Sequence, residues 1–385
     1  MSGMVRQCAT QPAWRSLCVL LFAGWVLAGC ATRPGPEVLS PVPSSVPGAK
    51  IVIVYVATTR AREIPSSNVF NNNRAPQLNY AEFRISIPPG HRPGEIEWPA
   101  LGLDPATSFT TLQQTVLDRS AFEQKITARE TRPGGSKVGL FIHGYNNNFQ
   151  EALFRMAQMT ADAEVDGVSV LFAWPSEGQL TGYVADKDAA TYSRDQLVEL
   201  MTMLARNQRI NRIDVLAHSM GCWLTAESLR QLRLTGNSAV INRMKVILAA
   251  PDIDIDVFRS QLDVIGPLSP PMTLLVSRDD KALDLSRRIA DARQRVGTID
   301  VDDPRVQEAA VRAKLQIVDI SNLNPTDAFN HDRYVSLSTI YRRLADEAST
   351  NPGGDLTRAG AFVFNTVGRT LSAPLTAAGV GQLGQ

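Results

Sequence analysis

Residues 212–230 read RIDVLAHSMGCWLTAESLR, and this stretch decides the fold. Residues 213–217 form a short apolar run that is typical of a buried parallel strand. Residues 220–230 have apolar positions that suit a helix packed on that strand. Between them lies AHSMG, a tight strand-turn-helix elbow of the G-x-S-x-G type in which Ala217 replaces the first glycine.

The serine of this turn is a candidate nucleophile. A tight elbow requires small flanking residues and forces the serine into a strained conformation that exposes its hydroxyl at the end of the strand. Ser219 also precedes a helix, where free N–H groups and the helix dipole favour developing negative charge. The alternative is a serine in an ordinary strand-to-helix turn, because such turns also occur without chemistry.

Composition limits the class of protein. With 385 residues, of which 44% are hydrophobic, the chain can bury one large core or two modest ones. The formal net charge of +1, with no basic stripe interleaved with aromatic residues, gives no field that would attract nucleic acid. We therefore expect a globular protein with no nucleic-acid partner.

The N-terminus has the pattern of a secretory signal. Arg6 and Arg15 precede an apolar run at residues 17–27, which is too short to span a bilayer as a helix. The run ends in LAGC at residues 27–30, which resembles the lipobox of bacterial lipoproteins. The resemblance implies cleavage before Cys30 and attachment of a diacylglyceryl group to its sulfur. The alternative is a generic signal peptide with an incidental cysteine.

A lipid on Cys30 has consequences for redox chemistry and location. After removal of residues 1–29, the chain keeps Cys30 and Cys222, so no intrachain disulfide can form. We expect Cys222 to be a small core residue. Ala31 and Thr32 follow Cys30 without an aspartate, which by resemblance to Gram-negative sorting rules predicts the outer membrane, with the protein facing the periplasm. The membrane, contacted through the N-terminal lipid, is thus an expected partner.

Composition also divides the rest of the chain. The Pro/Ser-rich residues 30–49 cannot form a core and are expected to be an extended tether. Residues 50–345 are predicted to form the main domain, and residues 346–385 a mostly mobile, low-complexity tail.

Strand and helix patterns alternate from residue 137 onward. We predict strands at residues 50–57, 80–87, 138–142, 168–174, 213–217, 244–250, 272–277 and 315–320. Helices are predicted at residues 148–164, 187–206, 220–230 and 279–295, with a helix or a loop running into one at 331–345. Residues 110–130 are assigned one strand and one helix, residues 68–79 a polar turn region, and residues 88–99 a loop with a solvated His91. The alternation predicts an α/β fold with a mostly parallel, doubly wound sheet, helices on both faces, and a site at the carboxyl ends of the strands.

Hydrolysis through a serine also needs a base, an acid that orients the base, and donors for the oxyanion. In an α/β-hydrolase the order along the chain is serine, acid, histidine. His331 is the one histidine that follows Ser219, which makes it the candidate base. The alternative for a single loop histidine is a solvated side chain.

Several carboxylates could be the acid. Asp280 follows the predicted strand at residues 272–277 and is the first candidate. Asp279 beside it, and Asp252 after the preceding strand, are alternatives. Each of them could instead lie at a helix N-terminus and interact with the dipole there.

The sequence HGY at residues 143–145 ends the strand predicted at residues 138–142. In this fold an N–H group of that loop and the N–H after the nucleophile bind the oxyanion, which selects Tyr145 and Met220. His143 is then expected to be a structural residue of the turn. A metal site through His143, His218 and His331 lacks the spacing of known motifs, so we expect neither a metal nor a cofactor.

Seven segments together resemble a bacterial family of α/β-hydrolases of unknown function labelled DUF900. They are HGYNNNFQEA, VLFAWPSEG, the helix at residues 192–204, LAHSMG, LAAPDIDIDVF, VSRDDKAL and NHDRYV. The similarity covers roughly residues 50–345. It implies the α/β-hydrolase fold and an esterase or lipase type of activity, but no particular substrate. By position it implies Ser219 as nucleophile, Asp280 as acid, His331 as base, and Tyr145 with Met220 as oxyanion donors.

Three functions are open from the sequence. The first is a lipid-anchored serine hydrolase that cleaves a carboxylic ester or lipid in the cell envelope. The second is a lipoprotein that uses a hydrolase fold as a binding or scaffold module. The third is an acyltransferase, because an alcohol can intercept the same acyl-enzyme in place of water. The filled triad positions favour an enzyme.

Overall fold

The structure is a computed structural model that describes residues 33–100, 102–128, 136–163, 167–290, 293–336 and 363–365. The chain divides into two units, Met1–Gly35 and Pro36–Gln385, and nearly all described residues belong to the second. The predicted signal peptide, Cys30 and most of the predicted tail lie outside the described residues. Within the described ranges, the helices are too short or too polar to cross a membrane.

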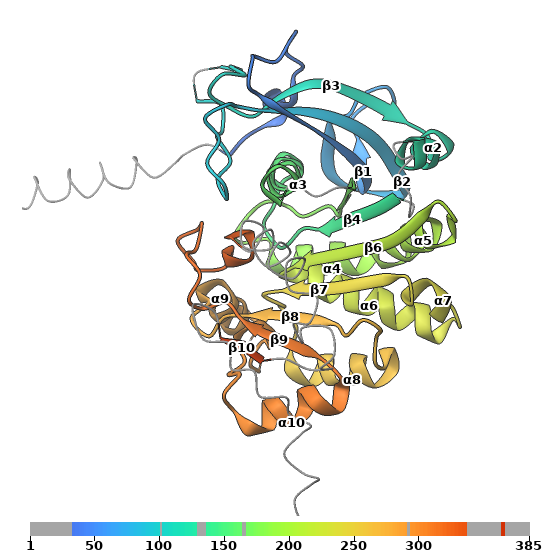
Figure 1. The fold of residues 1–385 in the computed structure, drawn as a ribbon, viewed down its shortest axis with the longest axis vertical. Coiled ribbons are helices and arrows are strands. Elements are labelled where there is room, and N and C mark those ends of the chain that lie inside the picture. Colours follow the sequence, from blue (N-terminus) through green and yellow to red (C-terminus); the bar gives the residue numbers. More distant parts are fainter. Residues whose placement is uncertain are drawn as a thin grey trace, which may run out of the picture. The chain divides into compact units, whose positions relative to one another are not determined.

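The strands of the described residues form one mixed sheet in the order β10-β9-β8-β7-β6-β4-β5-β1-β2-β3 (Figure 1). They are β1 (Lys50–Arg62), β2 (Phe70–Ile87), β3 (Thr110–Leu117), β4 (Ser136–Ile142), β5 (Val168–Ala173), β6 (Ile210–His218), β7 (Met244–Ala249), β8 (Thr273–Val276), β9 (Gln316–Asp319) and β10 (Val363–Asn365). All neighbouring strands from β10 to β1 pair in parallel, and β2 and β3 add an antiparallel edge. The predicted mostly parallel α/β sheet is confirmed.

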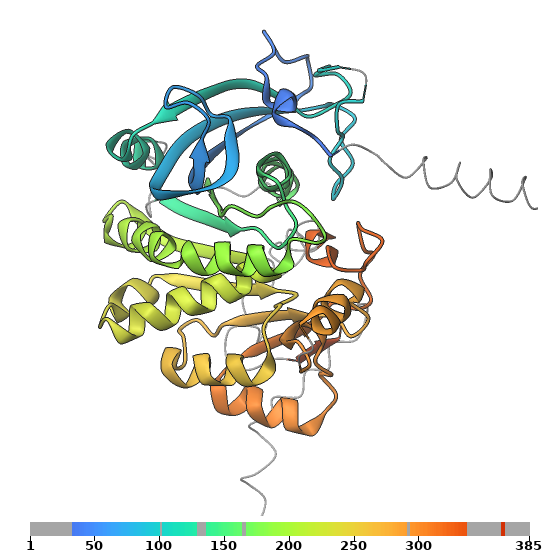
Figure 2. The same cartoon turned by 180° about the vertical axis from the view of Figure 1, so that it is seen from behind.

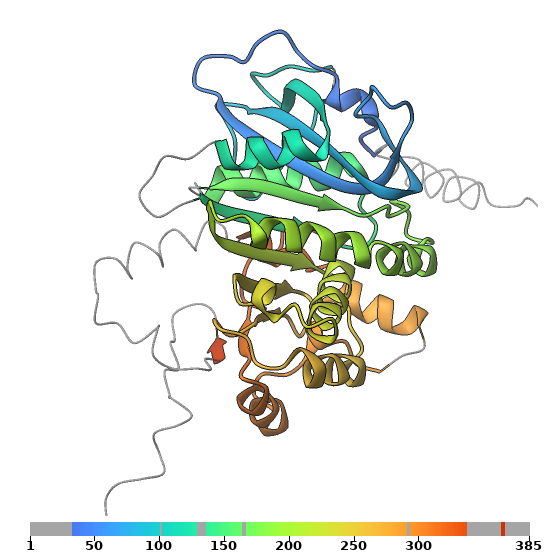
Figure 3. The ribbon, with the colours of Figure 1, turned by 90° about the vertical axis from the view of Figure 1, so that its right-hand side faces the viewer.

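Helices cover both faces of this sheet. They are α2 (Arg119–Ala128), α3 (Phe149–Ala163), α4 (Tyr183–Tyr192), α5 (Arg194–Arg206), α6 (Met220–Leu234), α7 (Ser238–Ile241), α8 (Ile255–Ile265), α9 (Lys281–Ile289) and α10 (Pro304–Ala313). Helices α5, α6 and α8 pack on one face, which is turned to the viewer in Figure 2, and α3 packs on the other. Figure 3 shows β1–β3 (blue to teal) at one end of the sheet and the C-terminal elements (orange) at the other.

A hydrophobic core lies on each face of the sheet, and the strand β5 shows why. All of its residues are buried, as expected for a parallel strand covered on both faces. Successive side chains of a strand point to opposite faces. Accordingly Val170 and Phe172 join the core under α5 and α6, whereas Leu171 and Ala173 join the core under α3. The sheet is thereby fixed from both sides, and the loops at its carboxyl edge rest on a rigid base.

Two predictions for the N-terminal strands need correction. Residues 68–79 are not a polar turn region, because β2 already begins at Phe70 and pairs with β1, with Arg74 opposite Arg60. This outer part of β2 is largely exposed, so its polar residues do not reveal a strand. His91 is not solvated: its Nδ1 and Nε2 atoms lie 2.8 Å from the carboxylates of Glu97 and Asp162.

The helices also differ from the prediction. The helix predicted at residues 187–206 is divided into α4 and α5 at Ser193, whose buried hydroxyl lies 2.7 Å from that of Thr59. The helices α8 and α10 were not predicted. Each begins after an aspartate whose side chain accepts backbone N–H groups of the first turn, Asp254 for α8 and Asp303 for α10.

Parts of both flanking segments belong to the fold. Within the predicted tether, residues Pro36–Leu39 form a 3-10 turn with Val38 and Leu39 buried, and the Val42 N–H donates to the Thr111 carbonyl. This stretch is therefore packed, not extended. In the region predicted as a tail, the backbone of β10 pairs with β9.

Candidate active site

The turn around Ser219 has the backbone of a nucleophile elbow. Ser219 follows β6 and precedes α6, with φ 53° and ψ −120°. A positive φ is strained for a residue with a side chain, so surrounding contacts must hold it. The Ser219 N–H donates to the Ala249 carbonyl on β7, and the Ser219 carbonyl accepts the N–H groups of Cys222 and Asp252.

Two glycines make room for this turn. A Cβ atom on Gly221 would lie 2.4 Å from the His143 carbonyl oxygen and 2.7 Å from that of Ile142, so no larger residue fits. A Cβ atom on Gly144 would lie 2.9 Å from the Ser219 Cβ atom. The backbone after β4 therefore lies against the serine, and the small residue at position 221 has a steric cause.

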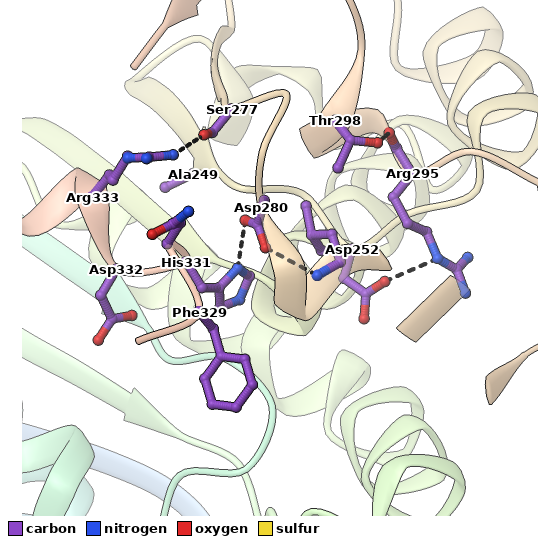
Figure 4. Close-up of polar contacts among 12 residues, drawn as sticks. Ala249, Asp252, Ser277, Asp280, Arg295, Thr298, Phe329, His331, Asp332 and Arg333 are labelled. Atoms are coloured by element: carbon purple, nitrogen blue, oxygen red, sulfur yellow. Dashed lines mark hydrogen bonds and ion pairs between the residues drawn. The ribbon is translucent and has the colours of Figure 1, made fainter. Parts of the chain in front are cut away.

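The structure brings His331 and Asp280 together. The His331 Nδ1 atom lies 2.7 Å from Oδ2 of Asp280 (Figure 4), and the Asp280 side chain is buried. The other Asp280 oxygen accepts the N–H of Leu283 and caps α9. Burial alone would lower the pKa of His331, but the charge and hydrogen bond of Asp280, helped by Asp332 and Asp327, raise it to about 9. Asp280 thus favours the protonated imidazole.

The imidazole of His331 contacts the ring of His218, the residue that precedes Ser219 in the elbow. The ring centroids of His218 and His331 are 4.5 Å apart, and Tyr334 stacks on His218 at 4.4 Å. Burial lowers the pKa of His218 well below its usual value, so this ring is neutral. Among the described residues, no hydrogen bond joins the Ser219 hydroxyl to His331. Catalytic hydrogen bonds are often long in the absence of substrate.

Asp252 points away from His331, as Figure 4 shows. Its carboxylate lies 3.1 Å from the Arg295 Nε atom and accepts the hydroxyls of Ser286 and Tyr183. These groups are all buried. Asp252 therefore completes a buried polar cluster that anchors the turn after β7.

Asp279 is engaged elsewhere as well. It forms an ion pair with Arg333 and accepts the Ser277 hydroxyl. The hydrogen bond from Arg333 is the main cause that lowers the pKa of Asp279 to about 2. This pair ties the loop that carries His331 to the loop after β8, while the contact to the imidazole itself belongs to Asp280.

The candidate oxyanion donors flank Ser219. Tyr145 lies in the loop after β4, one residue beyond Gly144, where an added Cβ atom would come within 2.9 Å of the Ser219 Cβ atom. Met220 is the first residue of α6, where backbone N–H groups have no partner within the helix. His143 is buried, and its ring stacks on Trp174 with centroids 4.8 Å apart. Burial lowers its pKa to about 3, so it is a neutral residue of the turn.

A family model described as alpha/beta hydrolase of unknown function (DUF900) matches residues 118–347. The match spans more than half of the 385 residues. The chain belongs to the DUF900 family. The described loops that contain Tyr145, Ser219, Asp280 and His331 all lie within the matched range. No curated protein matches the chain.

Several solved structures are similar at low identity. Est1E from Butyrivibrio proteoclasticus is 12% identical with a TM-score of 0.33, over 57% of this chain and 90% of that one. A fungal esterase from Rhizomucor miehei is 11% identical with a TM-score of 0.31, over 78% and 85%. An arylesterase is 10% identical with a TM-score of 0.32, over 88% and 98%. Likeness at this level adds nothing to the family assignment.

The sequence did not single out some residues of the site. His218 was considered only as part of a metal site, whereas in the structure its ring lies between those of His331 and Tyr334. The buried residues Arg60 and Asp186 lie near the loop after β4, yet they come from β1 and α4. Such distant partners have no local signature in the sequence.

Proposed function

We propose that this protein is a serine hydrolase that cleaves carboxylic esters through an acyl-enzyme on Ser219. The observation that carries the proposal is the buried Asp280 carboxylate 2.7 Å from His331 Nδ1. The His331 ring in turn lies 4.5 Å from that of His218, the residue before a serine held at positive φ. The family assignment supports a hydrolase. The nucleophile, base, acid and ester substrate are assigned here from the contacts of these side chains.

In the proposed first step, the Ser219 Oγ atom attacks the ester carbonyl carbon while Nε2 of His331 takes the hydroxyl proton. Asp280 accepts a hydrogen bond from Nδ1 of His331, which leaves Nε2 free to act as the base. The carbonyl electrons move to oxygen, and the N–H groups of Tyr145 and Met220 stabilise the resulting negative charge. Collapse of this intermediate returns the proton from His331 to the leaving alcohol.

The second step repeats the chemistry with water. His331 takes a proton from water, the hydroxide attacks the acyl carbon, and Ser219 leaves with the proton from His331. The acid is released and the enzyme returns to its starting state. Apart from the ester and water, the groups that act in both steps are side chains and N–H groups of the chain.

We also propose that the protein acts in the cell envelope, anchored through a lipid on Cys30. The support is the lipobox-like LAGC at residues 27–30 after an apolar run. A substrate in or near the membrane, an ester or a lipid, would then be within reach of the domain.

Hydrolysis of p-nitrophenyl esters from acetyl to dodecanoyl tests the enzyme proposal. We expect turnover by the domain from residue 36 onward, which includes the buried turn at Pro36–Leu39. Ser219→Ala and His331→Ala should each remove nearly all of it, and the double variant should be scarcely worse, because a triad acts as a unit. A folded wild type without turnover on any ester would leave a binding or scaffold module as the better account.

A further inference from the structure

The segment WPSEG at residues 174–178 follows β5 and was singled out by the sequence, but the proposed triad does not use it. In the structure it lies against residues 143–147, which we call the oxyanion loop. The buried Trp174 indole donates its Nε1–H to the His143 carbonyl at 2.8 Å and stacks on the His143 ring. The two loops are therefore joined at the start of the oxyanion loop.

A buried carboxylate joins them again further along. Asp186 of α4 is fully buried and accepts the backbone N–H groups of Asn146 at 3.1 Å and Glu177 at 2.6 Å. It also accepts the Ser176 hydroxyl at 2.6 Å, and the same Ser176 oxygen accepts the Asn147 N–H at 3.2 Å. One aspartate and one serine thus hold two successive peptides of the oxyanion loop.

A buried arginine also joins the oxyanion loop to the segment WPSEG. Arg60, at the end of β1, donates to the carbonyl oxygens of Asn147 at 3.0 Å and Ser176 at 2.9 Å. Burial lowers its pKa to about 10, opposed by the charge of Asp186, so the guanidinium stays charged at neutral pH. Buried charges are costly unless they are paired or hydrogen-bonded. Here the side chains of Arg60 and Asp186 both form hydrogen bonds with the oxyanion loop.

We propose that Ser176 and Asp186, with Arg60, are positioning residues that aim the Tyr145 N–H at the substrate oxygen. The inference rests on the proposed function. Tyr145 lies between Gly144, where an added Cβ atom would come within 2.9 Å of the Ser219 Cβ atom, and Asn146, whose N–H is held by Asp186. Asn146 has φ 57°, a left-handed turn conformation that asparagine tolerates better than most residues, and its N–H is held in this turn by Asp186. Because a donor contributes most when it is fixed before the reaction, loosening this loop should weaken binding of the oxyanion and leave binding of the uncharged substrate intact.

The test compares Ser176→Ala and Asp186→Asn with wild type and with a matched control, Ser228→Ala. Ser228 is a buried serine of α6, away from the oxyanion loop, whose hydroxyl donates to the Leu224 carbonyl at 2.9 Å and to the Arg194 carbonyl at 3.4 Å. For each protein we would measure kcat and KM on a p-nitrophenyl ester, the Ki of a trifluoromethyl ketone, and the Kd of the corresponding alcohol. Ser219 adds to the ketone carbon and passes its proton to His331, so the ketone oxygen becomes an oxyanion in the site, whereas the alcohol forms no bond to Ser219.

We expect kcat to fall about tenfold to a hundredfold in Ser176→Ala and Asp186→Asn, which is part of the effect of losing one oxyanion donor. The ketone Ki should rise in parallel, with little change in KM or in the alcohol Kd. The double variant should be scarcely worse than Asp186→Asn, because both residues act through one loop. Ser228→Ala should resemble wild type.

Two other results would overturn the inference while leaving the proposed function intact. In the first, the wild type is active, and Ser176→Ala and Asp186→Asn bind the ketone as tightly as the wild type does. The other is a variant that loses affinity for ketone and alcohol equally, together with a lower Tm, which would make the network purely structural. A folded wild type that neither hydrolyses esters nor binds the ketone would instead overturn the proposed function, and this inference with it.

Discussion

His331 and Asp280 are joined by a contact of 2.7 Å between Nδ1 and Oδ2, although 51 positions separate them in the chain. The other oxygen of Asp280 accepts the N–H of Leu283 at the start of α9. The helix therefore fixes the carboxylate and leaves one oxygen to orient the imidazole. Asp280 serves both as a helix cap and as the partner of His331, two roles that the sequence presented as alternatives.

Replacing Asp280 with Asn should lower kcat about a thousandfold or more with little change in KM, judging from triad acids in other hydrolases. The amide no longer stabilises the protonated imidazole, and it can present an N–H where an acceptor is needed. Steady-state kinetics on a p-nitrophenyl ester measures the effect.

Asp252→Asn is the control for that variant. It leaves Arg295 without its buried charge partner, which for buried pairs costs about 3–5 kcal/mol of unfolding free energy. We expect a lower Tm and a kcat much closer to wild type when the protein is assayed where it is folded. A folded but inactive Asp252→Asn, beside a fully active Asp280→Asn, would transfer the role of acid to Asp252.

The pH dependence follows from the raised pKa of His331. Only the neutral imidazole accepts a proton. We therefore expect kcat/KM to be low at neutral pH and to increase as the pH rises through an apparent pKa of about 9. Asp280→Asn removes the main charge that raises this pKa, so the residual activity should show its rising limb at lower pH. A wild-type profile that is flat between pH 6 and pH 10, or a limb that does not move in Asp280→Asn, contradicts this assignment of the base.

The same shift affects stability. The pKa of His331 is raised on folding from its usual 6.5 to about 9, so protonation of His331 stabilises the folded state. This contribution to the free energy of unfolding is fully present below pH 6.5. It is lost as the pH rises through about 9. Denaturant unfolding at a series of pH values should show this loss in the wild type and much less of it in His331→Ala.

Gly221→Ala should damage the elbow. The added Cβ atom would meet backbone oxygens at 2.4 Å and 2.7 Å, which cannot move without displacing β4. We expect a loss of about 3 kcal/mol or more of unfolding free energy, at the upper end for overpacking in a core. Gly139→Ala on β4 is the control, because its Cβ atom would meet nothing within 4 Å. Equal Tm values for the two variants would show that the turn tolerates a larger residue.

Cys30→Ser should release the protein from the membrane or leave it unprocessed. The expectation comes from LAGC at residues 27–30, and stable anchoring needs more than one acyl chain, since each buried methylene contributes about 0.8 kcal/mol. Membrane fractionation and mass spectrometry of the full-length protein from its native cells measure the outcome. An unmodified Cys30 in the mature protein would rule out the lipid anchor.

Much of the fold could be predicted from local patterns. The strands around residues 138–142, 168–174 and 213–217 are short buried runs, and the structure has them as β4, β5 and the end of β6. The helices α8 and α10 were missed, although each begins after an aspartate that caps its first turn. The break at Ser193 could not be seen, because it depends on a contact with Thr59 on a distant strand.

Some features of the candidate site could likewise be predicted from the sequence, and others could not. The elbow around Ser219 has a local signature, because the steric needs of the turn select small neighbours. Which aspartate meets His331 depends on how the loops after β8 and β9 lie over the sheet, and spacing alone left Asp280, Asp252 and Asp279 open. The raised pKa of His331 likewise depends on a neighbour 51 positions away, so spacing along the chain could not predict it.

The central claim is that Ser219 is a nucleophile activated by His331. Its most direct test is mass spectrometry of the folded domain after treatment with a fluorophosphonate, which is attacked by activated serines. We expect one phosphonyl group on the peptide that contains Ser219, and no label in Ser219→Ala or His331→Ala. An unlabelled Ser219 in a folded wild type, or equal labelling in His331→Ala, would contradict the claim.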